Sequence, residues 1–170
     1  FDIPVYIADK ESKRLVATSP VIKEKLIVLF GEELFDDGIL NKALLATHIF
    51  NDKDKLAAVN AIIHPEVKND FIGWAKAHAH FPVVAQEAAI LFESGFDKLM
   101  DKVVMVYTPL EMRIERVMAR DNIPREKVLE RIQNQMSDER KAELSDFVIV
   151  NDNKLSLIRQ VQAIIDKLRN

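Results

Sequence analysis

Short apolar runs that end at charged residues are the feature that most constrains the fold. Each run is rich in β-branched or aromatic residues and is bounded by polar residues or proline, which is typical of a buried strand. Helical patterns separate the runs, and this alternation is typical of a parallel sheet covered by helices. We therefore predict an α/β fold with four strands, at Val5–Ala8, Val83–Ala85, Val103–Tyr107 and Phe147–Val150.

The stretch between the first two predicted strands is almost entirely helical in pattern. Ser19-Pro20 is a favourable start for a helix over Val21–Phe30, and Gly31 ends it. Asp36-Asp37-Gly38 predicts a turn. Further helices are expected at Asn41–Asn51, at Asp54–Ile63, and from Pro65 to about His80. This helical stretch is longer than a single crossover between two parallel strands needs. We therefore expect it to contain a helical insertion that binds substrate.

The second half of the chain predicts four more helices. The first two are expected over Pro109–Arg120 and Pro124–Gln135. The third is a short helix that begins at the cap Ser137 and ends at Leu144, and the fourth is a closing amphipathic helix over Lys154–Arg169. Ser94-Gly95 predicts a turn after the apolar segment PVVAQEAAILFE.

Composition excludes several classes of function. The 170 residues fit one domain, and a net charge of −3 argues against sequence-independent nucleic-acid binding. The absence of cysteine excludes disulfides and thiolate metal sites and agrees with a cytoplasmic location. No apolar run approaches the roughly 18 residues of a membrane span. His78 and His80 lack a third ligand by spacing, so we assign no metal-ligating side chain.

Asp9 is the first candidate for chemistry. It directly follows a predicted strand, and ligands of open α/β sheets bind beyond the carboxyl ends of the strands. A carboxylate there could orient and deprotonate a substrate hydroxyl, or it could simply cap the next helix. Glu93, after AILF, has the same two interpretations, and Glu87 lies inside the apolar run.

Arginines gather on the helix after the third strand. Arg113, Arg116 and Arg120 share one helical face. Guanidinium groups that converge on one region could neutralise a transferring phosphoryl group. Alternatively, they form a solvated face paired with nearby acidic residues.

Two further residues allow a functional and a structural interpretation. The imidazole of His64, just before Pro65, could meet an anionic substrate or mark a helix junction. Asn151, after the last strand, could contact a nucleotide base, or its segment Asn151–Asn153 could cap the closing helix.

The series of motifs resembles the dephospho-coenzyme A kinase family. VYIAD, DDGILNKALL, IIHPEV, AAILFESG, RVMARDNI-REKVLERIQNQMS-ER and SDFVIVNDN occur in the family order and span nearly the whole chain. The resemblance implies a P-loop kinase fold with a three-layer parallel sheet, a helical substrate-binding region and a lid. It also implies transfer of the γ-phosphate of ATP to the ribose 3′-hydroxyl of dephospho-CoA, with Mg²⁺, as the last step of CoA biosynthesis.

The resemblance also assigns roles to individual residues. Asp9 matches the last Asp of the family's D-A-D motif, its general base, whereas Ile7 replaces the first Asp. Lys13 stands where the family has an arginine, so a point charge replaces a bidentate contact there. We expect Asp9, Lys13, His64 and Glu93 to contact the substrate.

For ATP, the resemblance implies contacts from the second half of the chain. Arg116 matches the lid-helix arginine that reaches the phosphates, with Arg120 as a helper. Arg140 and Asn151 are further candidates. We expect residues 1–170 to form one kinase domain, with a helical region over 11–80 and a lid over 109–145.

The family's glycine-rich phosphate loop, G-x-x-x-x-G-K followed by Ser or Thr, has no match in these residues. We expect it upstream of Phe1 in the intact gene product, on a strand between those that begin at Val83 and Val103. Residues 1–170 alone should then be inactive.

Two other functions fit parts of the pattern. A nucleoside or nucleotide kinase of the same fold would share the strand-end Asp and the lid arginines. A non-catalytic domain that binds a partner through its helices would explain the missing loop. Under the kinase interpretation, the partners are ATP and dephospho-CoA, and the region around Leu40–His80 holds the pantetheine-bearing substrate.

Overall fold

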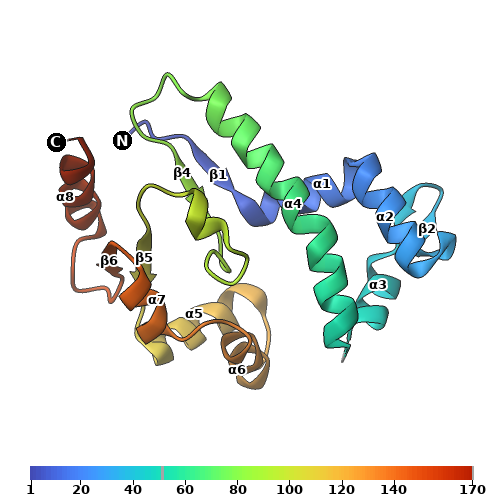
Figure 1. Ribbon diagram of the computed structural model, residues 1–170. Coiled ribbons are helices and arrows are strands. Elements are labelled where there is room, and N and C mark those ends of the chain that lie inside the picture. Colours follow the sequence, from blue (N-terminus) through green and yellow to red (C-terminus); the bar gives the residue numbers. More distant parts are fainter. Residues whose placement is uncertain (51, 170) are drawn as a thin grey trace. The chain divides into compact units, whose positions relative to one another are not determined.

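A computed structural model describes residues 1–50 and 52–169 of the chain. Its parts fall into two compact units, Phe1–Ala89 and Ile90–Asn170, which are described one at a time (Figure 1). Both units combine parallel strands with helices, so the predicted α/β class is confirmed.

The first unit begins with a strand that runs directly into a helix. Its elements are β1 (Val5–Ile7), α1 (Ala8–Thr18), α2 (Pro20–Phe30), the 3₁₀ helix η1 (Glu32–Leu34), β2 (Phe35–Asp36), β3 (Ile39–Leu40), α3 (Lys42–Ile49), α4 (Lys53–Ala77) and β4 (Ala85–Glu87). Strands β1 and β4 pair in parallel, and the register sets Val5 opposite Ala85 and Ile7 opposite Glu87.

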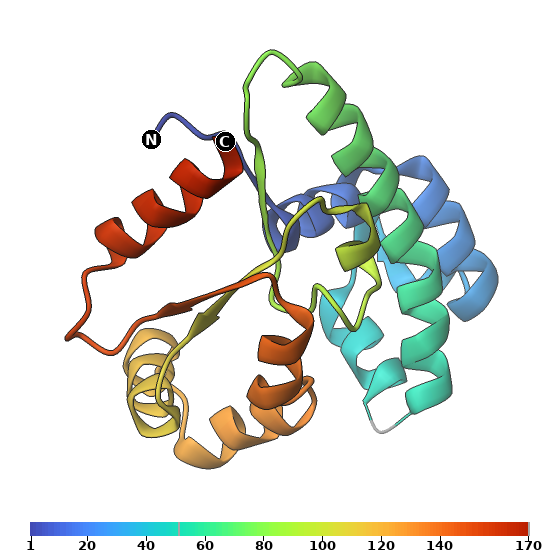
Figure 2. The same ribbon diagram turned by 60° about the vertical axis from the view of Figure 1, so that its left-hand side comes forward.

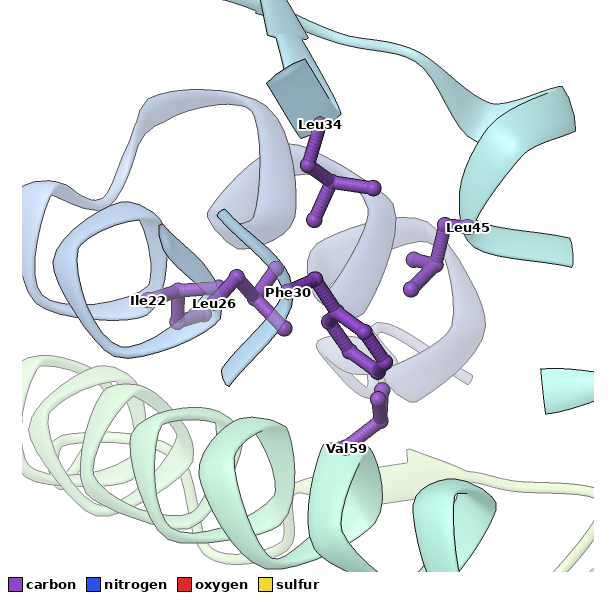
Figure 3. Packing of buried hydrophobic residues seen from close by; sticks show 6 residues of the cluster. All are labelled: Ile22, Leu26, Phe30, Leu34, Leu45 and Val59. Atoms are coloured by element: carbon purple, nitrogen blue, oxygen red, sulfur yellow. The ribbon is translucent and has the colours of Figure 1, made fainter. Parts of the chain in front are cut away.

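The core of the first unit lies among its helices. Figure 3 shows Ile22, Leu26, Phe30, Leu34, Leu45 and Val59, which come from α2, η1, α3 and α4. Ile22, Leu26 and Phe30 recur every four residues, so one stripe of α2 faces the other helices. Figure 2 shows α2, α3 and α4 gathered together in this way.

The second unit contains the other parallel pair. Its elements are η2 (Phe96–Leu99), β5 (Val104–Tyr107), α5 (Leu110–Asp121), α6 (Arg125–Gln133), α7 (Asp138–Leu144), β6 (Phe147–Val150) and α8 (Leu157–Arg169). Strands β5 and β6 pair in register from Val104–Phe147 to Tyr107–Val150. Met105, Ile114, Ile149 and Ile165 are buried and bring α5 and α8 onto these strands.

Several local predictions are confirmed. Ser19 accepts a hydrogen bond from the backbone of Ile22 at the start of α2, and α2 ends at Gly31 as expected. Ser137 caps α7 in the same manner. Asp37 and Gly38 have positive φ angles, 46° and 78°, and form the predicted turn as the tip of the β2–β3 hairpin.

Some boundary predictions are wrong. The closing helix, expected from Lys154, begins three residues later, at Leu157. The strand expected at Val83–Ala85 begins and ends two residues later, at Ala85–Glu87, because backbone pairing with β1 sets its limits. The break expected at Pro65 is absent, since α4 continues from Lys53 to Ala77 with Pro65 inside it. Val59 and Val67 are buried on the two sides of this proline, so packing holds both halves in one helix. Asn51, the expected end of α3, lies outside the described residues.

Within residues 1–50 and 52–169, no helix combines the length and the apolar character that crossing a membrane requires.

Candidate active site

Asp9 lies in the first turn of α1, immediately beyond the end of β1, and its side chain is exposed. The N-cap of α1 is Ile7, without a side-chain capping bond, and Asp9 is the second residue inside the helix. The capping interpretation of Asp9 is therefore wrong. Its exposed carboxylate lies at the carboxyl end of β1, the end of a parallel sheet at which ligands of open α/β folds bind.

A second carboxylate, which the sequence analysis named inside the apolar run but gave no role, lies at this sheet edge. Glu87 is the last residue of β4 and pairs with Ile7, the last residue of β1. In a parallel pair, both strands end at the same edge, so Glu87 and Asp9 belong to one end of the β1–β4 sheet. The sequence analysis gave Glu87 no role because the predicted strand ended at Ala85, two residues before it.

Arg116 differs from the other arginines of α5, α6 and α7 in what it binds. Its Nη2 donates to Asn153 Oδ1 at 2.7 Å, and its Nη1 donates weakly to the Asn151 carbonyl oxygen at 3.5 Å. Both partners are neutral oxygens in the segment after β6. Among the described residues, no ion pair engages Arg116, so its charge remains available to an anion.

The other arginines on these helices pair with carboxylates. Arg113 holds both oxygens of Asp138 at 2.9 Å, which joins α5 to α7. Arg120 pairs with Asp121, and Arg140 pairs with Glu143. The shared face of Arg113, Arg116 and Arg120 thus does not give them a shared role, since each guanidinium contacts a different partner.

Glu93 contacts the segment between α6 and α7. Its Oε1 accepts a hydrogen bond from the Met136 backbone at 2.7 Å and lies 3.5 Å from Lys141 Nζ. Burial raises the pKa of the Glu93 carboxyl, but the Met136 hydrogen bond and the Lys141 charge outweigh it, so the pKa lies below its usual value. Glu93 is therefore ionised at neutral pH and holds the region predicted to be a lid.

The remaining candidates lie apart along the chain. Lys13 is exposed on α1. His64 is half-buried inside α4, and burial lowers the pKa of its imidazole. The Asn151 backbone donates to Tyr107 and extends the β5–β6 pairing. The capping of the closing helix expected of Asn151–Asn153 is wrong: Asp152 Oδ1 accepts from the Lys154 and Leu155 backbones in the turn before α8, and Ser156 Oγ accepts from the Arg159 backbone at the start of α8.

Comparison with known proteins identifies the family. A family model described as dephospho-CoA kinase matches residues 1–156. This chain belongs to the dephospho-CoA kinase family. A Bacteroides fragilis protein named dephospho-CoA kinase is 49% identical over 163 residues, which cover 96% of this chain and 80% of that protein. A Porphyromonas gingivalis protein of the same name is 40% identical over 168 residues, or 98% of this chain and 83% of that protein.

Solved structures agree in fold. A crystal structure of a Thermus thermophilus protein superposes with a TM-score of 0.83 at 32% identity and covers 98% of this chain and 85% of that one. A dephospho-CoA kinase from Campylobacter jejuni superposes with a TM-score of 0.68 at 23% identity, over 98% of this chain and 85% of that one. The fold of this family is thus present across both units of the chain.

Proposed function

We infer that this chain transfers the γ-phosphate of ATP to the ribose 3′-hydroxyl of dephospho-CoA, the last step of CoA biosynthesis. The observation that carries this conclusion is the family match over residues 1–156, which includes both parallel strand pairs and every candidate residue. Small-molecule acceptors other than dephospho-CoA, and a purely non-catalytic role, lack such support.

Asp9 is the proposed general base. Its support is its place beyond β1, its exposure and its freedom from a capping role. In-line phosphoryl transfer needs the acceptor oxygen held opposite the leaving group, and a carboxylate that accepts the hydroxyl proton holds that oxygen as well. In this mechanism Asp9 takes the proton of the 3′-hydroxyl while the oxygen attacks the γ-phosphorus and the bond to ADP breaks.

Arg116 is the proposed contact for the ATP phosphates, because its charge faces only neutral oxygens in the described structure. A guanidinium there offsets the negative charge that spreads over the transferring phosphoryl group. Arg120 and Arg140 contribute only if ATP draws them away from Asp121 and Glu143. Asn151, next to Arg116 in space, is proposed to contact the nucleotide.

Dephospho-CoA is proposed to bind mainly through the first unit. Lys13 offers a positive point charge on the same helix as Asp9, and His64 offers a half-buried imidazole on α4. The helices around Leu40–His80 would hold the pantetheine arm and exclude water, which otherwise competes for the γ-phosphate. Glu93 would act by holding the lid segment at Met136.

Mg²⁺ is the proposed cofactor, and the residues at the end of the β1–β4 sheet suit it. Mg²⁺ prefers oxygen ligands and is usually held by one or two carboxylates, with waters and substrate phosphates completing its shell. Glu87 supplies a carboxylate at that edge, which leaves Asp9 free to act as the base. In the described part of the chain, no cluster of three such side chains exists, which fits a cation that arrives with ATP. Bound there, Mg²⁺ would neutralise phosphate charge. We also propose a cytoplasmic location, in agreement with the absence of cysteine.

Activity is tested by ADP release from the full-length gene product with ATP, Mg²⁺ and dephospho-CoA. Adenosine and nucleoside monophosphates serve as alternative acceptors. Turnover confined to dephospho-CoA is the expected result. Turnover with a nucleoside in its place would move the assignment to another kinase of the same fold.

The base is tested by Asp9→Asn. The amide keeps the size of the side chain but cannot take the proton, so kcat should fall by about 10²–10⁴-fold. Thermal stability should change little, because the side chain is exposed. Glu24→Gln, an exposed acid on α2, is the matched control and should retain wild-type turnover. Near wild-type kcat in Asp9→Asn would refute the assignment.

A further inference from the structure

Two side chains, one on each side of Asp9 in the sequence, bind the carboxylate of Asp70 in α4. Tyr6, the middle residue of β1, donates its hydroxyl to Asp70 Oδ2 at 2.7 Å. Arg14, further along α1, donates from Nη2 to both Asp70 oxygens, at 2.7 and 2.8 Å. Asp9 lies between Tyr6 and Arg14 in the sequence, so one carboxylate anchors the chain before and after the proposed base.

The ring of Tyr6 reaches this point because β1 turns it toward α4. Tyr6 is 2% exposed, whereas its neighbours Val5 and Ile7 on the other face are 51% and 43% exposed. The ring meets Phe71 and Trp74 edge to face, with centroids 5.3 and 5.5 Å away. Aromatic packing therefore fixes the ring, and the hydroxyl adds a directional bond to Asp70.

Few other contacts hold the start of α1. The helix has no buried side chain and no side-chain cap at Ile7. Leu15 and Val16, in the second half of α1, pack partly buried against the core of the first unit, but the first turn has neither a cap nor a buried side chain. The bonds from Tyr6 and Arg14 to Asp70 thus add to this packing and tie the chain to α4 on both sides of Asp9.

The protonation states suit these bonds. Burial raises the pKa of Asp70, but the hydrogen bonds from Arg14 and Tyr6 outweigh it and lower the pKa below its usual value. Burial and the bond to Asp70 raise the pKa of Tyr6. At neutral pH, Asp70 is therefore an ionised acceptor and Tyr6 a protonated donor, so the network is intact where the enzyme works.

We propose that Tyr6, Asp70 and Arg14 are positioning residues that hold Asp9 in line with the acceptor hydroxyl. This role rests on the proposed function of Asp9 as the base. None of the three needs to touch the reacting atoms, because a base displaced by about 1 Å can cost on the order of 10²-fold in rate. Removing the network should thus lower kcat more than it weakens the binding of ATP.

The test is a double-mutant cycle in the full-length gene product. Tyr6→Phe keeps the ring and removes the bond to Asp70 together with a long contact to the Val67 carbonyl oxygen at 3.5 Å, and kcat should fall by about 10-fold with KM for ATP unchanged. In an Asp9→Asn background, the same change should have no further effect, because there is no base left to position. Glu11→Gln is the matched control: it removes the partner of Arg14 within α1 and leaves Asp70 bound, and it should retain wild-type kcat.

Each outcome bears on one of the two assignments. Wild-type kcat in Tyr6→Phe, with Asp9→Asn inactive, overturns the positioning role and leaves the base in place. Equal losses from Tyr6→Phe with and without Asp9 show an independent effect and overturn the role as well. Active Asp9→Asn overturns the base, and the positioning role with it.

A second variant serves as a control for the possibility that Tyr6→Phe destabilises the fold. If Tyr6→Phe lowers Tm strongly, Arg14→Lys replaces it, because lysine keeps the charge of this largely exposed side chain but not the geometry of the guanidinium. A kcat loss in Arg14→Lys that vanishes in the Asp9→Asn background supports the role. A kcat equal to that of the wild type overturns it.

Discussion

At the scale of single residues, the chemistry of an arginine depends on which oxygen it meets. Arg120 and Arg140 meet carboxylates, which neutralise them, whereas Arg116 meets the amide oxygen of Asn153 and a backbone carbonyl. A neutral oxygen orients a guanidinium without cancelling its charge. Arg116 is therefore oriented by the segment after β6 and still able to attract phosphate.

Arg116→Ala should lower kcat/KM for ATP by about 10²–10³-fold, because a charge that stabilises the transition state is lost. Steady-state kinetics with varied ATP measures this. Arg116→Lys should recover only part of the loss, since lysine lacks the planar fork.

The control for Arg116 is Arg125→Ala. Arg125 holds both oxygens of Glu111, at 2.7 and 2.8 Å, on an exposed surface. Its removal deletes an arginine of the same region but no proposed phosphate contact. Equal losses in the two variants would show that Arg116 acts only through the general charge of these helices.

At the scale of elements, Asp121 joins the end of α5 to α6. Arg120 and Arg131 both donate to its carboxylate, and these hydrogen bonds lower the pKa of Asp121 to about 2. The folded-state pKa thus lies below the unfolded value of about 3.9. Stability from this group is present above the unfolded pKa and is lost as the pH falls through the folded pKa.

Asp121→Asn should therefore lower Tm slightly at neutral pH, and this difference from the wild type should shrink as the pH falls from about 4 to about 2. The effect is small because the pair is exposed. Thermal unfolding across this range measures it, with Asp101→Asn, an exposed acid of the same unit, as control. A difference that grows on acidification would contradict the sign of the pKa shift.

The helix α4 contains a proline that its own sequence disfavours. Pro65 has no N–H to donate to the carbonyl of Ala61, and its ring crowds that carbonyl. A helix-interior proline costs about 3 kcal/mol relative to alanine, although alanine leaves the unfolded chain freer by about 0.4–1 kcal/mol. The packing of Val59 and Val67 offsets this cost.

Pro65→Ala should raise the free energy of unfolding by about 1–2 kcal/mol, after some relaxation of the native helix is allowed for. Urea unfolding followed by circular dichroism measures the change. Lys68→Ala, an exposed change on the same helix, should stay within about 0.5 kcal/mol of the wild type. Destabilisation by Pro65→Ala would mean that the native packing requires the geometry of proline.

At the scale of the whole molecule, the candidate residues divide between two units. Asp9, Lys13 and His64 belong to Phe1–Ala89, and Arg116 and Asn151 belong to Ile90–Asn170. The proposed roles follow the same division, with the acceptor bound mainly by the first unit and ATP mainly by the second. Each substrate should then stabilise a different part of the chain.

Hydrogen exchange of the full-length gene product tests this division. Dephospho-CoA alone should slow exchange most in α3 and α4, and ATP alone should slow it most in α5 and around Asn151, because binding reduces local opening. Mass spectrometry of peptides from the two units measures both effects. Free pantetheine, which is only part of dephospho-CoA, is included as a comparison ligand. Protection by ATP confined to α3 and α4 would contradict the division.

The sequence predicted which residues are candidates for the site better than it predicted which residues they contact. Asp9 was identified because a carboxylate after an apolar run is visible in the sequence. Glu87 was named in the apolar run, but a shift of two residues in the expected strand hid its place at the sheet edge. The Arg116–Asn153 contact joins residues 37 apart, and no local pattern encodes such a pair.

The sequence by itself determined the elements whose causes are local. The caps at Ser19 and Ser137, the turn at Asp37-Gly38 and the stop at Gly31 depend on a few neighbouring atoms, and all are present. Tertiary structure alone decided the continuity of α4 through Pro65, the limits of β4 and the partner of each arginine. The physical reason is that burial and ion pairing act between segments distant in sequence, and their free energies outweigh local preference wherever the two compete.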